Sequence, residues 1–171
     1  MLETKRLILR ELQPEDAEAI FRILSDEQVV RYYDTLMTQL EQAQSVIARH
    51  RKRFENNEGI RWGITLKGDM EVVGNCGFFI DSRNRCAILS YVLERPYWNR
   101  GIMTEALEAI IPFGFDHYRL HRIEAHVALP NLASLRVLKK LGFQEEGLLG
   151  KRMYENRFHD EKVVALLKSY T

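Results

Sequence analysis

The chain begins with an alternating pattern of apolar and polar positions and then changes to helical spacing. Leu7 and Leu9 alternate with charged or less buried neighbours, which predicts a strand over about residues 5–12. A helix follows Pro14-Glu15-Asp16, and its apolar positions lie three and four residues apart at Ala17, Ile20, Phe21 and Leu24. A second helix is expected from Thr38, with Glu41 as its capping-box partner and an inner stripe of Leu40, Ala43, Ile47 and Phe54.

The period then shortens to two residues. Ile60, Trp62, Ile64 and Leu66 alternate with Arg61, Gly63, Thr65 and Lys67, which predicts a half-buried strand. Turns at residues 67–69 and 81–84 lead into two further strands, over about residues 71–80 and 86–93. These three strands predict an antiparallel meander.

A long helix is expected over about residues 100–116, with one face made of Met103, Leu107, Ile110, Ile111 and Gly114. Pro112 lies inside this helix, where it removes an N–H group and clashes with the carbonyl of Glu108, so we expect a kink or a widened turn. A strand follows at residues 122–127, with Ile123, Ala125 and Val127 on one side.

Asn131 is expected to cap a helix whose apolar positions are Leu132, Leu135, Leu138 and Leu141. Gly142 ends this helix, and Phe143 is placed to contact Leu138 in a Schellman closure. Strand-like segments at residues 144–153 and 158–167 complete the chain. This order, without repeats or linkers, predicts a single domain over residues 1–171 of the α+β class. Its mixed, mostly antiparallel twisted sheet would have about six to seven strands, flanked by about four helices.

The composition excludes several functional classes. Lys and Arg number 25 against 24 acidic residues, so the basic excess typical of nucleic-acid-binding proteins is absent. The dense basic run at residues 49–53 lies at a helix end, where cations complement the dipole, and contact with an acidic or RNA-bearing partner is the alternative. Without a signal peptide or an apolar run of roughly 20 residues, the protein is expected to be soluble and cytoplasmic. Cys76 and Cys86 lie in strand-like runs and are expected to be buried and reduced.

The helix start at residues 98–104 is unfavourable for a helix alone. Acidic residues normally gather in the first turn, because a helix N-terminus carries roughly half a positive charge. Here Arg100 adds a cation, Gly101 weakens the first turn, and the first acidic residue is Glu105. Each of these features is unfavourable for an isolated helix but favours an anion bound at the helix N-terminus. The alternative is an imperfectly capped surface helix, with Asn99 as the cap. The phosphate fingerprints of P-loop and dinucleotide sites are both absent.

Several segments, taken in order and spacing, resemble the GNAT superfamily of N-acetyltransferases, and specifically its ribosomal-protein alanine acetyltransferase (RimJ/RimL-like) branch. They are residues 3–10, 91–93, 97–107, 121–125 and 131–143. The resemblance implies the GNAT fold and an enzyme that moves the acetyl group of acetyl-CoA to a primary amine by direct attack in a ternary complex. The amine would belong to a protein N-terminus or a small molecule, no metal would be needed, and a homodimer is compatible with the resemblance.

The resemblance also implies a binding site for acetyl-CoA. Its pyrophosphate would lie on the helix start formed by Trp98, Asn99, Arg100, Gly101, Ile102, Met103 and Thr104, and Lys140 would add to this site. Trp98 replaces the Gln or Arg of the superfamily pattern, as is usual in this branch, and Met103 replaces a Gly or Ala and is expected to crowd the phosphate loop. The strand with Tyr91, Val92 and Leu93 would pair with the pantetheine arm. An N–H group near Val92 or Leu93 would then polarise the thioester carbonyl.

The sequence N-x-x-S at Asn131 and Ser134 indicates helix capping when taken alone. The resemblance implies that Asn131 reaches the cofactor arm and that Ser134 lies near the sulfur. Many superfamily members protonate the thiolate with a tyrosine at the position of Leu138, so Ser134 is our candidate acid. A Glu that is frequent in this branch is replaced by Ile88. Glu94, Glu124 and His126 remain as candidate bases, the last two on one face of a strand.

The acceptor pocket is expected in the segment from about residue 25 to residue 53, lined by Tyr32, Tyr33 and Met37. His117, His121 and His126 lack a metal-ligand spacing, so no metal site is predicted. The missing tyrosine and strand Glu leave an alternative function, a module that binds acyl-CoA or a peptide with little or no turnover.

Overall fold

The computed structural model describes residues 1–33, 36–154 and 157–169, apart from the side chains of residues 151–154 and 157. One eight-stranded sheet runs through the chain in the order β1-β2-β3-β4-β5-β6-β8-β7. Its strands are β1 (Leu2–Glu3), β2 (Leu7–Glu11), β3 (Gly59–Leu66), β4 (Val72–Asp81), β5 (Cys86–Leu93), β6 (Arg122–Ala128), β7 (Gln144–Tyr154) and β8 (Arg157–Leu167). The helices are α1 (Ala17–Leu24), α2 (Leu40–Glu55), α3 (Ile102–His117) and α4 (Leu132–Lys140), with short 3-10 turns at Pro14–Asp16 and Arg95–Tyr97. The predicted α+β class is confirmed, and the sheet has slightly more strands than expected.

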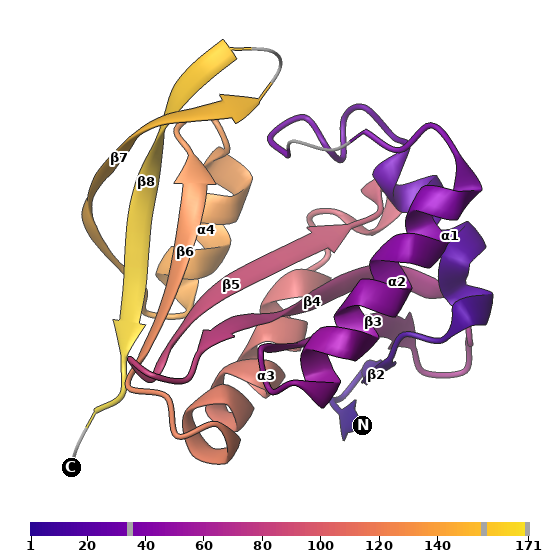
Figure 1. Cartoon of the computed structure of the whole chain (residues 1–171), viewed down its shortest axis with the longest axis horizontal. Coiled ribbons are helices and arrows are strands. Elements are labelled where there is room, and N and C mark those ends of the chain that lie inside the picture. Colours follow the sequence, from indigo (N-terminus) through magenta and orange to yellow (C-terminus); the bar gives the residue numbers. More distant parts are fainter. Residues whose placement is uncertain (34–35, 155–156, 170–171) are drawn as a thin grey trace.

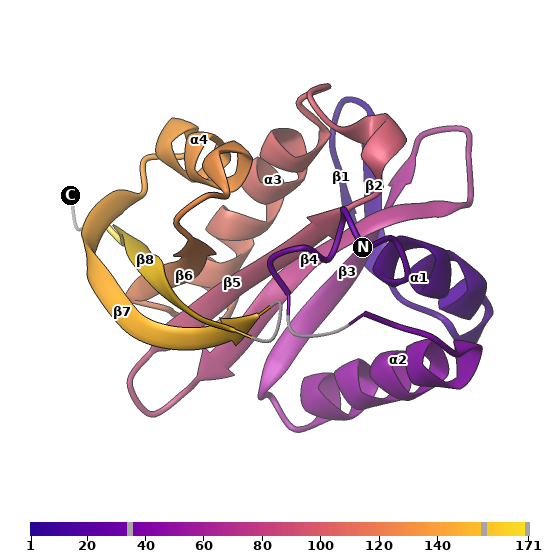
Figure 2. The same cartoon turned by 90° about the horizontal axis from the view of Figure 1, so that it is seen from above.

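The helices cover the two faces of the sheet separately. Helices α1 and α2 lie on one face and α3 and α4 on the other (Figures 1 and 2). Each face has its own buried cluster. Trp62, Phe78 and Ile110 belong to the cluster beneath α3, whereas Ile20, Ala43 and Val92 belong to the cluster beneath α1 and α2. The alternating residues of β3, β4 and β5 therefore enter two different cores.

This double cover corrects the prediction for β3. Trp62 and Ile64 are buried as expected, but Gly63 and Thr65 on the opposite face are buried too. Helices pack on both sides of this strand, so its alternation marks two chemically different faces rather than an exposed and a buried one.

Two details of α2 also differ from the prediction. Its N-cap is Gln39, and the capping-box partner is Gln42, so the box lies one residue after the Thr38–Glu41 pair. Ala43 and Ile47 are buried, but Phe54 is 46% exposed, because it lies in the last turn beyond the packed stripe.

The structure tests the helices of the second half. The expected face of α3 is buried, and the chain stays α-helical through Pro112, so the widened turn is wrong, while the alternative of a kink stays a prediction. Pro112 lies on the exposed side, where water can satisfy the carbonyl of Glu108. The Schellman closure of α4 is confirmed by the bonds from Phe143 N–H to Leu138 O and from Gly142 N–H to Lys139 O, both 3.1 Å. Leu132 is 60% exposed, because α4 packs on the core through Leu135, Val137 and Leu138 and not through its first residue.

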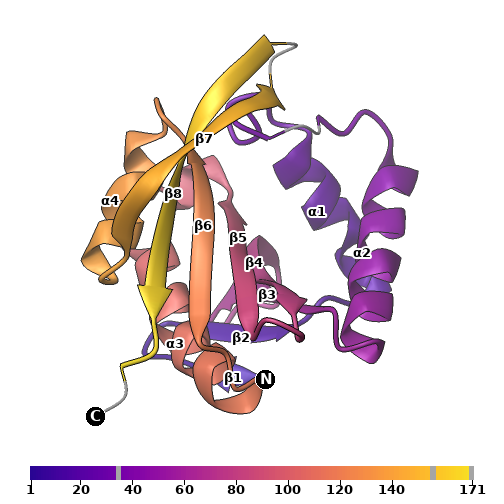
Figure 3. The ribbon, with the colours of Figure 1, turned by 60° about the vertical axis from the view of Figure 1, so that its left-hand side comes forward.

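Strands β5 and β6 diverge after a short contact. They form a parallel pair over only three registered positions, from Cys86 with Arg122 to Ile88 with Glu124. Beyond these positions β6 continues beside β8, and β5 continues beside β4 (Figures 1 and 3). Residues 89–93 of β5 therefore present a strand edge without a partner strand in the described part of the chain.

Candidate functional site

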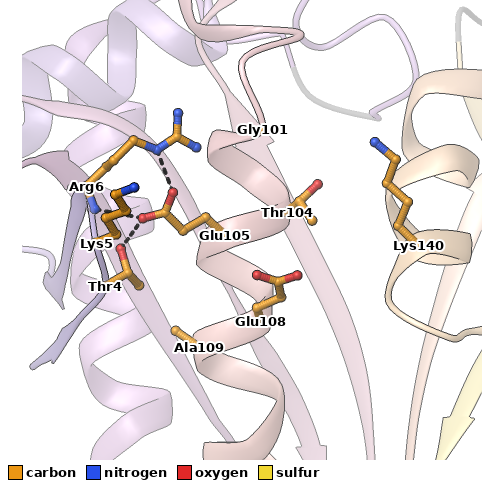
Figure 4. A pocket seen from close by; sticks show the side chains of 9 residues that line it. All are labelled: Thr4, Lys5, Arg6, Gly101, Thr104, Glu105, Glu108, Ala109 and Lys140. Atoms are coloured by element: carbon orange, nitrogen blue, oxygen red, sulfur yellow. Dashed lines mark hydrogen bonds and ion pairs between the residues drawn. The ribbon is translucent and has the colours of Figure 1, made fainter.

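A pocket of about 580 Å³ lies where α3 begins. Figure 4 shows its lining: the chain segment Thr4-Lys5-Arg6 on one side, the first turns of α3 in the middle, and Lys140 at the end of α4 on the other side. Gly101, Thr104, Glu105, Glu108 and Ala109 supply the α3 wall. The predicted residues Gly101, Thr104 and Lys140 are thus brought together, while Lys5 and Arg6 were not predicted for this site.

The start of α3 is suited to an anion. Gly101 is the N-cap and has a φ of +71°, in the left-handed region where glycine carries no steric penalty. The expected place of Gly101 in the first turn is therefore wrong by one position. No side chain among the described residues caps this helix, so Asn99 is not the cap. The first-turn N–H groups point along the helix axis and can bind an anion.

Glu105 ties the N-terminal segment to this helix start. Its carboxylate accepts hydrogen bonds from Thr4 Oγ1 at 2.5 Å, Arg6 N at 2.8 Å and Arg6 Nε at 2.6 Å. Arg6 Nη1 also donates to the carbonyl of Arg100, at 2.9 Å. Burial acts to raise the pKa of Glu105, but the hydrogen bonds from Thr4 and Arg6 outweigh it, so the pKa lies below its ordinary value. The negative charge of Glu105 is thus balanced by Arg6, and Arg6 is held beside Gly101.

Three predicted residues of this segment have other roles. Trp98 donates its indole N–H to the carbonyl of Leu93 at 2.7 Å, which fixes the turn to the end of β5. Ile102 and Met103 are buried in the core beneath α3. The expectation that Met103 crowds the phosphate loop is therefore wrong, because its side chain points away from the pocket lining.

The edge of β5 presents alternate backbone groups. Glu94 N–H bonds to Val73 O at 2.9 Å, so Glu94 and Val73 form a hydrogen-bonded pair. Such pairs alternate along an antiparallel ladder, so Val92 and Ser90 also bond to β4. The N–H and carbonyl groups of Tyr91 and Leu93 consequently point to the opposite side, toward the divergence from β6. Two N–H groups were predicted to polarise the thioester. That of Leu93 points to this open edge, whereas that of Val92 bonds to β4.

Two hydroxyl groups meet between β5 and α4. Tyr91 Oη lies 2.6 Å from Ser134 Oγ. Asn131 caps α4 by accepting from Ser134 N–H at 3.2 Å, as the capping interpretation predicts. Burial raises the pKa of Tyr91, outweighing the opposing hydrogen bond from Ser134, so this hydroxyl stays protonated. A tyrosine hydroxyl from a neighbouring strand thus lies against the first turn of α4.

Glu124 and His126 lie on the sheet face opposite α3. Glu124 accepts from Arg122 Nε at 2.8 Å and lies 3.1 Å from His126 Nε2. Burial opposes ionisation of Glu124, but the hydrogen bonds from Arg122 and His126 outweigh it and lower its pKa. Glu124 is also the registered partner of Ile88, the position where a strand carboxylate is missing. Strand β6 therefore carries a carboxylate in the same row.

The other predicted site residues lie in different parts of the structure. Glu94 pairs with Arg22 at 2.7 Å, which ties β5 to α1. Tyr33 donates its hydroxyl to the carbonyl of Tyr91, on the open edge of β5. Tyr32 contacts Arg31 in a cation–π pair. Met37 is 2% exposed and belongs to the core beneath α1, so it does not line an open surface. Residues 34 and 35 of the predicted acceptor segment lie outside the described residues.

Cys76 and Cys86 are both free, and Cys86 is only partly buried, contrary to expectation. Within residues 1–33, 36–154 and 157–169, no group of three or more His, Cys, Asp or Glu side chains could hold a metal ion. None of the helices in the described part of the chain combines the length and the apolar character needed to cross a membrane.

Residues 6–144 match the family model described as acetyltransferase (GNAT) domain. The chain is 39% identical over 171 residues to the uncharacterized N-acetyltransferase YoaA of Bacillus subtilis (strain 168), covering 98% of this chain and 97% of that protein. A GNAT-family acetyltransferase structure from Bacillus anthracis has a TM-score of 0.86 at 26% identity and covers 98% of both chains. RimL, a ribosomal L7/L12 alpha-N-protein acetyltransferase solved with coenzyme A, has a TM-score of 0.86 at 19% identity, covering 96% of this chain and 95% of that chain.

Proposed function

The chain belongs to the GNAT family of N-acetyltransferases, and we propose that it transfers the acetyl group of acetyl-CoA to a primary amine bound on the α1/α2 face of the sheet. The observation that carries this proposal is the combination of an uncapped helix start, an unpaired β5 edge and a hydroxyl pair at their junction. The coenzyme A complex of RimL, a structural neighbour, supports the choice of donor.

The pocket at the start of α3 fits the pyrophosphate of the donor. The first-turn N–H groups and the left-handed Gly101 offer an anion-binding backbone, and Lys5 and Lys140 supply positive charge around it, while the charge of Arg6 is balanced by Glu105. From this pocket the pantetheine arm would follow β5, where the N–H of Leu93 faces the open edge and can donate to an amide carbonyl of the arm. The carbonyls of Leu93 and Tyr91 already accept hydrogen bonds from Trp98 Nε1 and Tyr33 Oη. The N–H of Tyr91, farther from the pocket along β5, would donate to the thioester carbonyl as negative charge develops on it, because the amides of the arm lie between the pyrophosphate and the sulfur.

The amine attacks the thioester carbonyl carbon directly, with both substrates bound. A new C–N bond forms, the C–S bond breaks, and the leaving thiolate needs a proton. Ser134 supplies this proton and regains one from Tyr91, because the two hydroxyls already share a hydrogen bond. Tyr91 then takes up a proton from solvent as coenzyme A leaves. The pair therefore takes the place of a tyrosine on α4.

The ammonium proton goes to the Glu124–His126 pair. We assign the accepting atom to the Glu124 carboxylate, because 23% of this side chain is exposed, whereas His126 Nδ1 is buried and has no hydrogen-bond partner among the described residues. Arg122 and His126 hold the carboxylate ionised and oriented. The carboxylate is thus ionised at neutral pH, and because its lowered pKa makes it a weak base, it would take up the proton only transiently and pass it to solvent.

Calorimetric titration with coenzyme A tests the donor site. Lys140→Ala should weaken binding about 2- to 5-fold and reduce its salt dependence, because an exposed ion pair contributes about 1 kcal/mol or less. Lys139→Ala, which changes the neighbouring position outside the pocket, should leave the Kd unchanged. Absence of coenzyme A binding by the wild-type protein would contradict the proposal.

A further inference from the structure

Arg61 lies across the central strands on the face that the acceptor would use. Its registered partner on β4 is Gly77, and the partner of Gly77 on β5 is Ser90. Residues in such a row share one face of the sheet. Trp62 belongs to the core beneath α3, so this row faces α1 and α2. Gly77 has no side chain, and the guanidinium can therefore cross β4 to reach β5.

The contacts of Arg61 are all with neutral groups. Nη1 donates to Asn75 Oδ1 at 3.2 Å and to the carbonyl of Ser90 at 2.9 Å, and Nη2 donates to Ser90 Oγ at 3.2 Å. No Asp or Glu in the described part of the chain forms an ion pair with this half-buried cation. Arginine is rarely withdrawn from water without a counter-charge, because desolvation is costly.

The surroundings add positive charge instead of balancing it. Arg53 of α2 and Arg61 both stack on Phe79, with guanidinium carbons 4.8 Å and 5.4 Å from the ring centroid. Burial, together with the charges of Arg61, Arg53 and Arg49, lowers the pKa of His50 to about 3. His50 is therefore neutral at physiological pH. The region has an excess of positive charge that a negatively charged ligand would balance.

The unused donors of Arg61 have the geometry of a carboxylate site. A guanidinium has five N–H groups, and the contacts above use two on Nη1 and one on Nη2. The Nε–H and the second Nη2–H have no partner among the residues that the structure describes. These two groups lie on the same side of the planar fork, which binds a carboxylate through two parallel hydrogen bonds.

This site adjoins the reacting groups. Ser90 precedes Tyr91, whose hydroxyl contacts Ser134 and whose carbonyl accepts from Tyr33. Ile88 and Ser90 point to the same face, and Ile88 is registered with Glu124. Arg61 and the base candidate thus flank the open edge of β5 on one side of the sheet.

We propose that the acceptor carries a carboxylate next to its primary amine and that Arg61 binds this carboxylate while the amine faces the β5 edge. This inference rests on the proposed function. It narrows the acceptor to amines of the amino-acid type and makes Arg61 a specificity-determining residue.

Matched acceptors test the inference. Acetyl transfer to L-amino acids and to their carboxamides is measured with the wild-type protein, Arg61→Gln, Arg61→Lys and Arg51→Gln. The ratio of kcat/KM for acid over carboxamide should favour the acid in the wild-type protein and fall about 10- to 100-fold in Arg61→Gln. Comparing this ratio between variants cancels the different amine pKa values. Arg51→Gln removes an equal charge from the exposed part of α2 and should keep the wild-type ratio.

The possible outcomes distinguish the role of Arg61 in acceptor binding from the proposed acetyl transfer. Coenzyme A binding with no preference for acids, or the same preference in Arg61→Gln, overturns the role of Arg61 and leaves acetyl transfer standing. If Arg61→Gln fails to fold, Arg61→Lys takes its place, because lysine keeps the positive charge but lacks the two parallel N–H groups. An unchanged acid-over-carboxamide ratio in Arg61→Lys also overturns the inference. A second readout needs no turnover: the amino acids should raise the Tm of the coenzyme A complex more than their carboxamides do. Equal effects on the Tm count against the inference. Failure to bind coenzyme A overturns the proposed function together with this inference.

Discussion

Tyr91 Oη lies 2.6 Å from Ser134 Oγ and joins the open edge of β5 to the first turn of α4. Burial keeps Tyr91 protonated, so the pair holds an available proton beside the place proposed for the leaving sulfur. A serine hydroxyl alone is a weak acid, and a tyrosine partner that can replace its proton makes the assignment to Ser134 chemically stronger. The hydroxyl pair is therefore central to the proposed mechanism.

Removal of either hydroxyl should slow the chemical step. Ser134→Ala and Tyr91→Phe should each lower kcat about 100-fold, because positioned proton transfer typically contributes factors of this size or more. The Kd for coenzyme A should change less than threefold. Steady-state kinetics and calorimetry on the two variants provide the measurement.

The double variant gives a sharper control. If the two hydroxyls act as one unit, Ser134→Ala combined with Tyr91→Phe should cost no more than the slower single variant. Multiplicative losses would mean that the hydroxyls act separately and would exclude the proton relay.

The backbone conformation of Gly101 should matter for donor binding. A Cβ at this position would meet only Arg6 Nη2, at 3.5 Å, so the cost of Gly101→Ala comes from the φ of +71°. This conformation costs an L-residue about 1–2 kcal/mol, and relaxation of the loop should weaken coenzyme A binding about tenfold. Gly68→Ala is the matched control, because Gly68 has a φ of +88° in the turn between β3 and β4 and does not line the pocket. Equal coenzyme A affinities in both variants would refute a special role for the loop.

Loss of the Glu124 carboxylate should impair proton removal. The lowered pKa of Glu124 means that it is ionised at and above the ordinary titration range of Glu, near pH 4. Glu124→Gln should therefore lower kcat about 100-fold uniformly between about pH 6 and pH 9, without changing the shape of the profile.

Glu146→Gln is the control for this network. Glu146 contacts Arg122 at 2.6 Å from the outer side and is proposed to take no part in the chemistry. Its kcat should stay within a factor of about three of the wild-type value. A comparable loss in the two variants would show that the network only holds the fold, and the base would have to be sought elsewhere.

Asp16 should govern stability in acid. Its buried carboxylate accepts from both Nη atoms of Arg10, each at 2.8 Å, and from Gln13 N at 2.7 Å. Burial raises its pKa, but these hydrogen bonds outweigh it, so the folded-state pKa is lowered. A lowered pKa stabilises the fold above about pH 4 and loses this contribution as the pH falls through the folded-state pKa.

Asp16→Asn should therefore reduce the free energy of unfolding by about 2–4 kcal/mol at pH 7 and by less at acidic pH. Urea titrations at several pH values measure this difference. Glu3→Gln removes an exposed partner of Lys67 and should change the stability by less than about 0.5 kcal/mol. A loss for Asp16→Asn that does not depend on pH would contradict the electrostatic account.

Local patterns predicted most of the secondary structure. The alternation at residues 60–93, the apolar face of α3, the Asn131 cap and the closure at Gly142 all depend on neighbours a few residues apart, and the structure has each of them. The exceptions, such as the buried Thr65 and the exposed Leu132, depend on which helix packs against each face. Sequence periodicity carries no information about that choice.

The site was less predictable, because its contacts join distant segments. Glu105 bonds to Thr4 and Arg6 across about a hundred positions, and Tyr91 meets Ser134 across 43 positions. The unfavourable charges at the start of α3 predict an anion site there, and this stays a prediction. The helical spacing placed Met103 on the buried face, as the structure has it, whereas the expectation that Met103 crowds the phosphate loop treated its side chain as facing the anion.

Transfer of a labelled acetyl group tests the central claim most directly. The wild-type protein is incubated with acetyl-CoA that carries a deuterated acetyl group and with a mixture of primary amines, and free thiol and amine masses are measured together. The proposed function predicts equal amounts of coenzyme A thiol and labelled N-acetyl product, with both slowed about 100-fold in Ser134→Ala. Tight binding of acetyl-CoA without labelled product would contradict it and would identify the protein as a binding module.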